Sequence, residues 1–173
     1  RENNDRLGMG YALNGLGVVA WRRGDLAAAQ VQLEESLHLY QEAGDKRFIA
    51  FAYNDLGQLA HARGEDADAR KLCRKALRIF RELGDRQGQA ESLAALAAAS
   101  GPMPEAARLF GAADALRVTL GAPVPLVERD GYDRDAAAAR QVLGADAFDA
   151  DWRAGQALSH DQIMGEALSM LSE

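Results

Sequence analysis

The sequence predicts an all-α protein, built as an array of helical hairpins with further helices covering its C-terminal end. One observation is a 40-residue period, in which Leu16-Gly17 returns as Leu56-Gly57 and again as Leu96-Ala97. A second is composition: much of the 48% hydrophobic content is alanine, the best helix former, and no stretch keeps the alternation of a strand. A fixed period of this kind is typical of hairpins that bury their apolar faces against their neighbours.

The first helix of each hairpin is indicated by apolar residues spaced three and four apart, and in the first hairpin it is expected over about 5–23. The small residue after the repeated leucine should let the second helix cross closely. Gly24 and Gly64 should end these helices, because glycine readily takes the left-handed conformation. The inward positions expected are Gly10, Leu13, Leu16, Gly17 and Ala20, and their equivalents Ala50, Tyr53, Leu56, Gly57 and Ala60.

The second helices are expected over about 26–43 and 66–83, with Gly44 and Gly84 at their ends. The third hairpin is shorter than the period. Its first helix should lack a last turn, with Pro102 and Pro104 marking the bend. Its second helix should bury Ala106, Phe110 and Ala113.

After Gly121 the repeat stops, and a proline-containing link leads to three expected helices, over about 127–143, 145–158 and 160–171. Ser159 and Gln162 form a capping box for the last of these. The division predicted is three hairpins over residues 1–121 (about 5–44, 45–84 and 85–121) and capping helices over 122–173. The apolar residues expected to cover the open end of the third hairpin are Phe148, Trp152, Ile163, Met164, Leu168 and Leu171.

Composition narrows the class of function. A net charge of −6 disfavours direct nucleic-acid binding, which needs a basic face. Cys73 is the only cysteine, no apolar run approaches the roughly 20 residues of a membrane helix, and no signal peptide is visible. We therefore expect a cytoplasmic protein. The many arginines, alanines and glycines suggest a bacterial source, and the missing initiator methionine suggests a segment of a longer protein.

The pattern Leu-Gly-x-x-Ala, then Gly-Asp or Gly-Glu, then an alanine-led helix resembles the tetratricopeptide repeat. The 40-residue form is similar to that of MalT-like and LuxR-type bacterial regulators. Residues 106–113, 120–123 and 152–158 resemble the C-terminal segment of those proteins. The resemblance implies a right-handed array that follows an ATPase module, often beside a helix-turn-helix or cyclase domain.

In tetratricopeptide arrays the first helices line a concave groove that binds a partner. By this resemblance the groove residues are Tyr11, Asn14, Val18, Trp21, Phe51, Asn54, Gln58 and His61, followed by Glu91, Ala94 and Ala98 in the third hairpin. Asn14 and Asn54 can each donate and accept, which suits a peptide backbone, although both could equally be solvated polar residues. Tyr11 and Trp21 could anchor a partner or pack against a preceding repeat. With alanine at two positions of the third hairpin, recognition of an acidic C-terminus is not expected.

No catalytic constellation is visible in the sequence. The three histidines lie far apart, no phosphate-binding Gly-x-x-x-x-Gly-Lys loop is present, and Cys73 falls on an apolar stripe. We expect no enzyme activity, metal or cofactor in this chain, and any ATPase or cyclase activity would belong to other domains. The function predicted is binding of a protein, a peptide, an effector or neighbouring domains of the same protein. The alternative is a structural self-association module that forms homo-oligomers.

Overall fold

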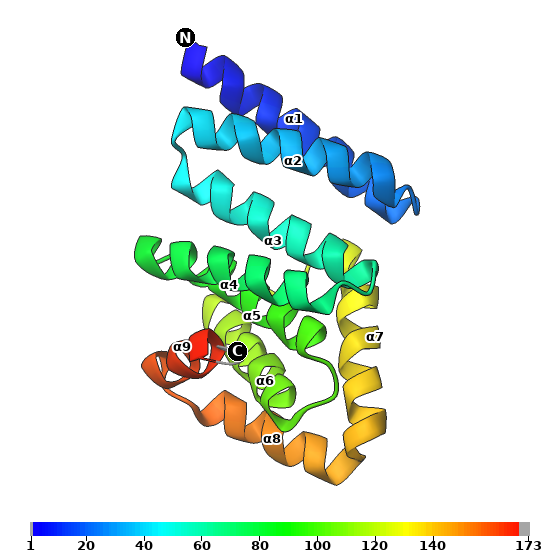
Figure 1. Cartoon of the computed structure of the whole chain (residues 1–173). Coiled ribbons are helices and arrows are strands. Elements are labelled where there is room, and N and C mark those ends of the chain that lie inside the picture. Colours follow the sequence, from blue (N-terminus) through cyan, green and yellow to red (C-terminus); the bar gives the residue numbers. More distant parts are fainter. Residues whose placement is uncertain (1, 170–173) are drawn as a thin grey trace. The chain divides into compact units, whose positions relative to one another are not determined.

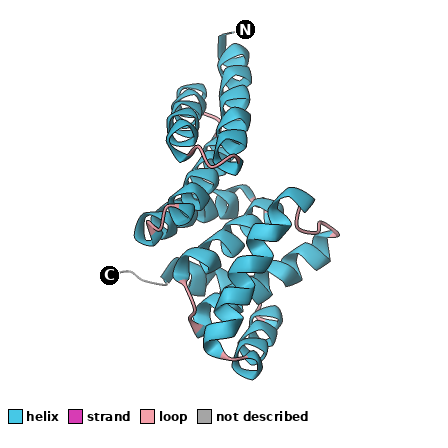
Figure 2. Cartoon of the chain, turned by 90° about the vertical axis from the view of Figure 1, so that its right-hand side faces the viewer, coloured by secondary structure: helices cyan, strands magenta, loops and turns pink. Residues whose placement is uncertain are grey.

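The computed structural model describes residues 2–169, which form helices joined by short loops, with no strand in that range (Figure 2). The predicted all-α class of helical hairpins is therefore confirmed. The chain separates into two compact units, Arg1–Leu83 and Gly84–Glu173. The division does not fall at residue 121, because the third hairpin belongs to the same unit as the C-terminal helices. The point at which repeats give way to capping helices stays a prediction.

The first unit holds two hairpins (Figure 1). Their helices are α1 (Glu2–Arg22), α2 (Leu26–Ala43), α3 (Lys46–Ala62) and α4 (Asp66–Leu83). The bounds of α2 and α4 are those predicted from the sequence.

The recurring Gly-Asp pair explains why these helices end and restart where they do. Gly44 ends α2 with a φ of 71°, in the left-handed region. The next residue, Asp45, begins α3 by accepting hydrogen bonds from the backbone N–H groups of Arg47 and Phe48, at 3.0 and 3.1 Å. One dipeptide thus stops one helix and caps the next.

In each hairpin of the first unit, one glycine lets the two helices approach closely: Gly17 in the first and Gly57 in the second. A Cβ atom added at Gly17 would lie 2.8 Å from Cγ of Leu33, and one added at Gly57 would lie 2.6 Å from Sγ of Cys73. Leu33 and Cys73 are themselves 40 residues apart and occupy the same repeat position. The close crossing predicted from the small residue after the leucine is therefore confirmed.

The core of the first unit includes a cluster that joins α2 to α3: Ala29, Leu33, Leu56 and Leu59. Leu56 is 5% exposed because α2 covers its face of α3. Leu16, the equivalent residue of α1, was also expected to point inward, and this is wrong, since it is 55% exposed. Leu56 is covered by α2, which belongs to the preceding hairpin. Among the described helices none precedes α1, so Leu16 has no equivalent cover.

The second unit comprises α5 (Arg86–Ser100), α6 (Pro104–Leu120), α7 (Leu126–Leu143), α8 (Ala145–Ala157) and α9 (His160–Ser169). The first helix of its hairpin, α5, has 15 residues where α3 has 17, as the shortened period predicted. Ala106, Phe110 and Ala113 are buried on α6, also as predicted.

Helix α8 packs directly on α6. Phe148 clusters with Ala107 of α6, and the ring of Trp152 stacks on that of Phe110 with centroids 6.2 Å apart. Two glycines set the separation: a Cβ atom on Gly111 would lie 2.0 Å from the carbonyl oxygen of Trp152. A Cβ atom on Gly155 would lie 2.0 Å from the carbonyl oxygen of Arg108. The two backbones are therefore in contact at this crossing.

Helix α9 buries Ile163, Met164 and Ala167, and Leu168 is half-buried. The capping box predicted for this helix is present. The backbone N–H of Gln162 donates to Oγ of Ser159 at 3.3 Å, and the backbone N–H of Ser159 donates to Oε1 of Gln162 at 2.9 Å. Leu171, which was expected to join this apolar face, lies outside the described residues.

Candidate functional site

The predicted groove residues of α1 do not share one environment. Tyr11 is 68% exposed. Val18 and Trp21 are half-buried and pack against the cluster of Ala29, Leu33, Leu56 and Leu59. Trp21 thus contributes to the core of its own unit. Tyr11 is the open aromatic side chain of this set.

Asn14 is tied to the neighbouring hairpin. Its side-chain N–H donates to Oδ2 of Asp55 on α3 at 2.8 Å, and both residues are partly buried. A hydrogen bond to a charged acceptor is among the stronger kinds in proteins. Asn14 therefore links α1 to α3, a role the sequence pattern could not show, because its partner lies 41 residues away.

Asn54, which occupies the same repeat position as Asn14, lies in a different environment. It is 3% exposed, and its Oδ1 atom has no hydrogen-bond partner among the described residues. The interpretation of the two asparagines as solvated polar residues does not fit this burial. They also do not form an equivalent open pair, because one is engaged with Asp55 and the other is buried.

The remaining groove residues lie on α3. Phe51 makes an edge-on contact with Phe80, with centroids 5.0 Å apart, and the guanidinium of Arg47 lies 5.7 Å from its ring centre. His61 pairs with Asp66 of α4 at 2.5 Å. Gln58 is half-buried. Phe51 and His61 therefore join α3 to α4, while Tyr11 and Gln58 are the predicted residues for which the structure gives no such packing role.

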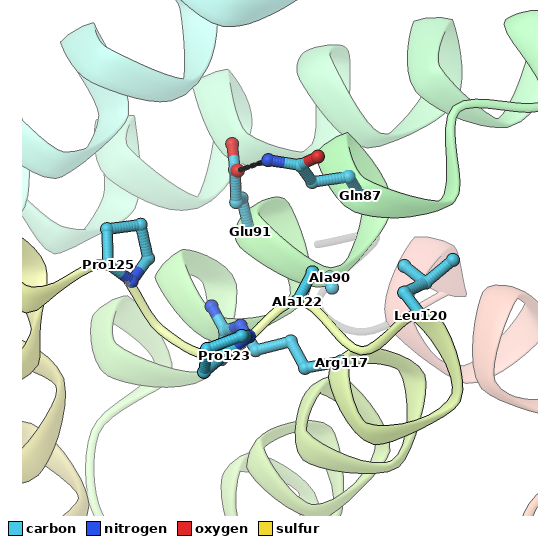
Figure 3. A pocket seen from close by; sticks show the side chains of 8 residues that line it. All are labelled: Gln87, Ala90, Glu91, Arg117, Leu120, Ala122, Pro123 and Pro125. Carbon is cyan, nitrogen blue, oxygen red and sulfur yellow. Dashed lines mark hydrogen bonds between the residues drawn. The ribbon is translucent and has the colours of Figure 1, made fainter.

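The second unit contains a hollow that could not be predicted from the sequence. It lies where α5, the end of α6 and the link to α7 meet, and it measures about 270 Å³ including its open mouth (Figure 3). Its lining residues, which we call the Arg117 hollow, are Gln87, Ala90, Glu91, Arg117, Leu120, Ala122, Pro123 and Pro125.

Arg117 is the unusual member of this lining. It is 7% exposed, and its Nη1 atom is buried with no hydrogen-bond partner among the described residues. Its guanidinium lies 5.0 Å from the ring centre of Tyr132 on α7. One signal for it was present in the sequence: Arg117 continues the three-and-four spacing of Ala106, Phe110 and Ala113, so a charged residue occupies the buried stripe of α6.

A second arginine, Arg108, holds the C-terminal helices together. Its guanidinium pairs with Glu166 of α9 at 2.7 Å and with Asp151 of α8 at 3.2 Å. Burial lowers the pKa of Arg108, but the hydrogen bonds and charges of Glu166, Asp151 and Glu105 together outweigh that effect, so its pKa is raised. Arg108 therefore joins three helices, and its donors are already engaged.

No group of three or more His, Cys, Asp or Glu side chains within residues 2–169 is arranged to hold a metal ion. No helix in that part of the chain has the length and apolar character needed to cross a membrane.

Comparison with known proteins gives a family match within the first unit. Residues 8–82 match the family model of the tetratricopeptide repeat. This range begins in α1 and ends in α4, so it covers most of both hairpins of the first unit. A search of curated proteins gave no match. The match supports a tetratricopeptide repeat region over residues 8–82, and repeats of this kind generally mediate protein–protein interaction.

Proposed function

We propose that this chain is a non-catalytic binding module of a larger bacterial signalling or transcription-regulatory ATPase, acting in the cytoplasm. Its ligand would be a protein, a peptide, an effector or a neighbouring domain of the same protein. The observation that carries the proposal is the tetratricopeptide repeat region over residues 8–82. Solenoid repeats of this type use extended surfaces formed by successive repeats to bind partners.

The surface proposed for the partner is the one formed by α1 and α3. The hydrogen bond from Asn14 to Asp55 joins these two helices. It would therefore keep Tyr11 and Gln58 at a constant distance from each other. An exposed tyrosine is a frequent interface anchor, because its ring offers apolar area and its hydroxyl a hydrogen bond. Asn14 would act mainly by positioning, and Asn54 would contribute only if its amide became accessible.

The regulatory context is supported by the resemblance of residues 106–113, 120–123 and 152–158 to the C-terminal segments of LuxR-type regulators. In this proposal the chain senses a partner and relays its binding to the attached domains. ATP hydrolysis or DNA binding would belong to those domains.

The test compares two variants of the full-length protein. Tyr11→Ala combined with Gln58→Ala should weaken partner capture at least about tenfold, since hot-spot side chains commonly contribute more than 2 kcal/mol. The control is Val31→Ala, which removes a side chain that is 63% exposed on α2. Captured proteins are quantified by mass spectrometry, and circular dichroism checks the fold. Equal capture by the folded double variant and the control would exclude the α1–α3 surface.

Self-association is the second candidate, and one observation favours it. Met9, Leu16 and Val19 on α1 are 57%, 55% and 47% exposed. Such an apolar stripe is a common site of contact between copies. Sedimentation of the chain should then show a mass that rises with concentration. Leu16→Glu should abolish the rise, while Val31→Glu on α2 should leave it unchanged; a constant monomer mass would exclude this candidate.

A further inference from the structure

The Arg117 hollow contains a buried charge with an unused donor. Arg117 is 7% exposed, and Nη1 finds no acceptor among the described residues. Leaving a buried donor unsatisfied is costly, and more so when the group is charged. A group that brings an acceptor into the hollow would remove this cost.

The lining of the hollow combines polar side chains, Arg117 among them, with an apolar part. Figure 3 shows the Arg117 side chain running from α6 beneath the Ala122–Pro123 segment of the link. The apolar part, which we call the apolar rim, consists of the aliphatic side chains and proline rings of Ala90, Leu120, Pro123 and Pro125. A ligand suited to both parts has an anionic oxygen at one end and a short alkyl group at the other.

Two features limit the size and charge of such a ligand. The enclosed part of the hollow is narrow, so only a group of a few atoms fits beside Arg117. Glu91 also lines the hollow, and its carboxylate accepts a hydrogen bond from Gln87 at 3.2 Å. A second negative charge would therefore be repelled, and a monoanion is favoured over a phosphate or another dianion.

We propose that the Arg117 hollow binds a small aliphatic monocarboxylate, with Arg117 holding the carboxylate and the apolar rim holding the alkyl chain. The guanidinium is suited to this role because its planar donors match the geometry of a carboxylate. The guanidinium also makes a cation–π contact with Tyr132, whose ring centre lies 5.0 Å from its central carbon. This site depends on residues of the second unit alone and is independent of the partner surface on α1 and α3.

The test is a titration of the ¹⁵N-labelled chain with acetate and then propionate, at constant ionic strength kept by sodium chloride. Backbone amide shifts of Glu91 and Ala122 report on the hollow. We expect saturable shifts at these amides and a tighter fit for propionate, because its extra methylene reaches the apolar rim. Inorganic phosphate should bind no better than chloride. Amide shifts that never saturate would overturn the proposal. A response to phosphate equal to that for propionate would overturn it as well.

Variants of two lining residues test the roles assigned. Arg117→Gln should weaken propionate binding at least about tenfold, since a hydrogen bond to a charged group is lost. Glu91→Gln should tighten it, because a repelling charge is removed. Unaltered binding in a folded Arg117→Gln chain would overturn the proposal. If that variant does not fold, the result for Glu91→Gln decides, and unchanged or weaker propionate binding there would equally overturn it.

Discussion

At the scale of single residues, the glycines inside helices differ in what surrounds them. A Cβ atom at Gly57 would meet a sulfur atom of a side chain, whereas one at Gly111 would meet the backbone of Trp152 at 2.0 Å. A side chain can move by rotation, but a backbone moves only with its helix. Gly165 on α9 has nothing within 4 Å of the same position. These three sites therefore predict three different responses to one added methyl group.

We expect Gly111→Ala to lower the free energy of unfolding by about 3 kcal/mol or more, at the upper end of the range for overpacking. Gly57→Ala should cost about 1–3 kcal/mol, because Cys73 can give way only in part. Gly165→Ala, the matched control, should raise stability by roughly 0.5–1 kcal/mol through helix propensity. Urea unfolding of the three variants gives the comparison. Equal stability of the Gly111 and Gly165 variants would contradict the contact between α6 and α8.

The sequence predicted the role of Gly57 but not that of Gly111. Gly57 occupies a repeat position, and the 40-residue period aligns it with Gly17 against the facing helix. Gly111 of α6 meets Trp152 of α8, and Gly155 of α8 meets Arg108 of α6, so each contact involves α8, a helix outside the period. A periodic pattern identifies contacts that recur and does not identify contacts that occur once.

At the scale of elements, the start of α9 depends on two reciprocal hydrogen bonds between Ser159 and Gln162. Ser159→Ala removes the one accepted by the hydroxyl and should destabilise the helix by about 0.5–2 kcal/mol. Hydrogen exchange of the α9 amides should accelerate accordingly. Ser169→Ala, at the other end of α9, is the control and should leave exchange in the first turn unchanged. Unaltered exchange in the Ser159 variant would mean that packing alone holds this helix.

Helix bounds were largely predictable because their signals are local. Asp25 caps the start of α2, Gly44 ends it, and α4 lies between Gly64-Glu65 and Gly84. The environments of the groove residues were less predictable. The partner of Asn14 is on another helix, Asn54 is buried, and Trp21 turns toward the core. Helical spacing places a residue on a face, but the tertiary neighbours decide whether that face is open.

At the scale of the whole molecule, two buried acids connect stability to alkaline pH. Burial raises the pKa of Cys73 from 9.0 to about 12 and that of Tyr132 from 10.0 to about 12. The unfolded chain therefore loses these protons at lower pH than the folded chain. The stability that the protonated Cys73 thiol and Tyr132 hydroxyl contribute is fully present below pH 9. It is lost as the pH rises from 9 toward 12.

The free energy of unfolding should accordingly fall more steeply above pH 9 in the native chain than in Cys73→Ala, which has no thiol to titrate. Below pH 9 the two curves should run parallel, because the cavity left by the substitution costs the same at each pH. Chemical denaturation between pH 7 and 11 measures both curves. Parallel curves across the whole interval would show that the thiol is not protected by burial.

The crossing of α6 and α8 at Gly111 and Gly155 also limits which sequences this fold can accept. Each glycine faces a carbonyl oxygen, so no smaller neighbour can be chosen to make room for a larger residue. A library randomised at both positions and selected for folding should return glycine at both, while Gly165 should vary freely. Protein engineering should therefore keep both glycines at this crossing. The exposed side of α8 can then be redesigned, with the crossing as its scaffold.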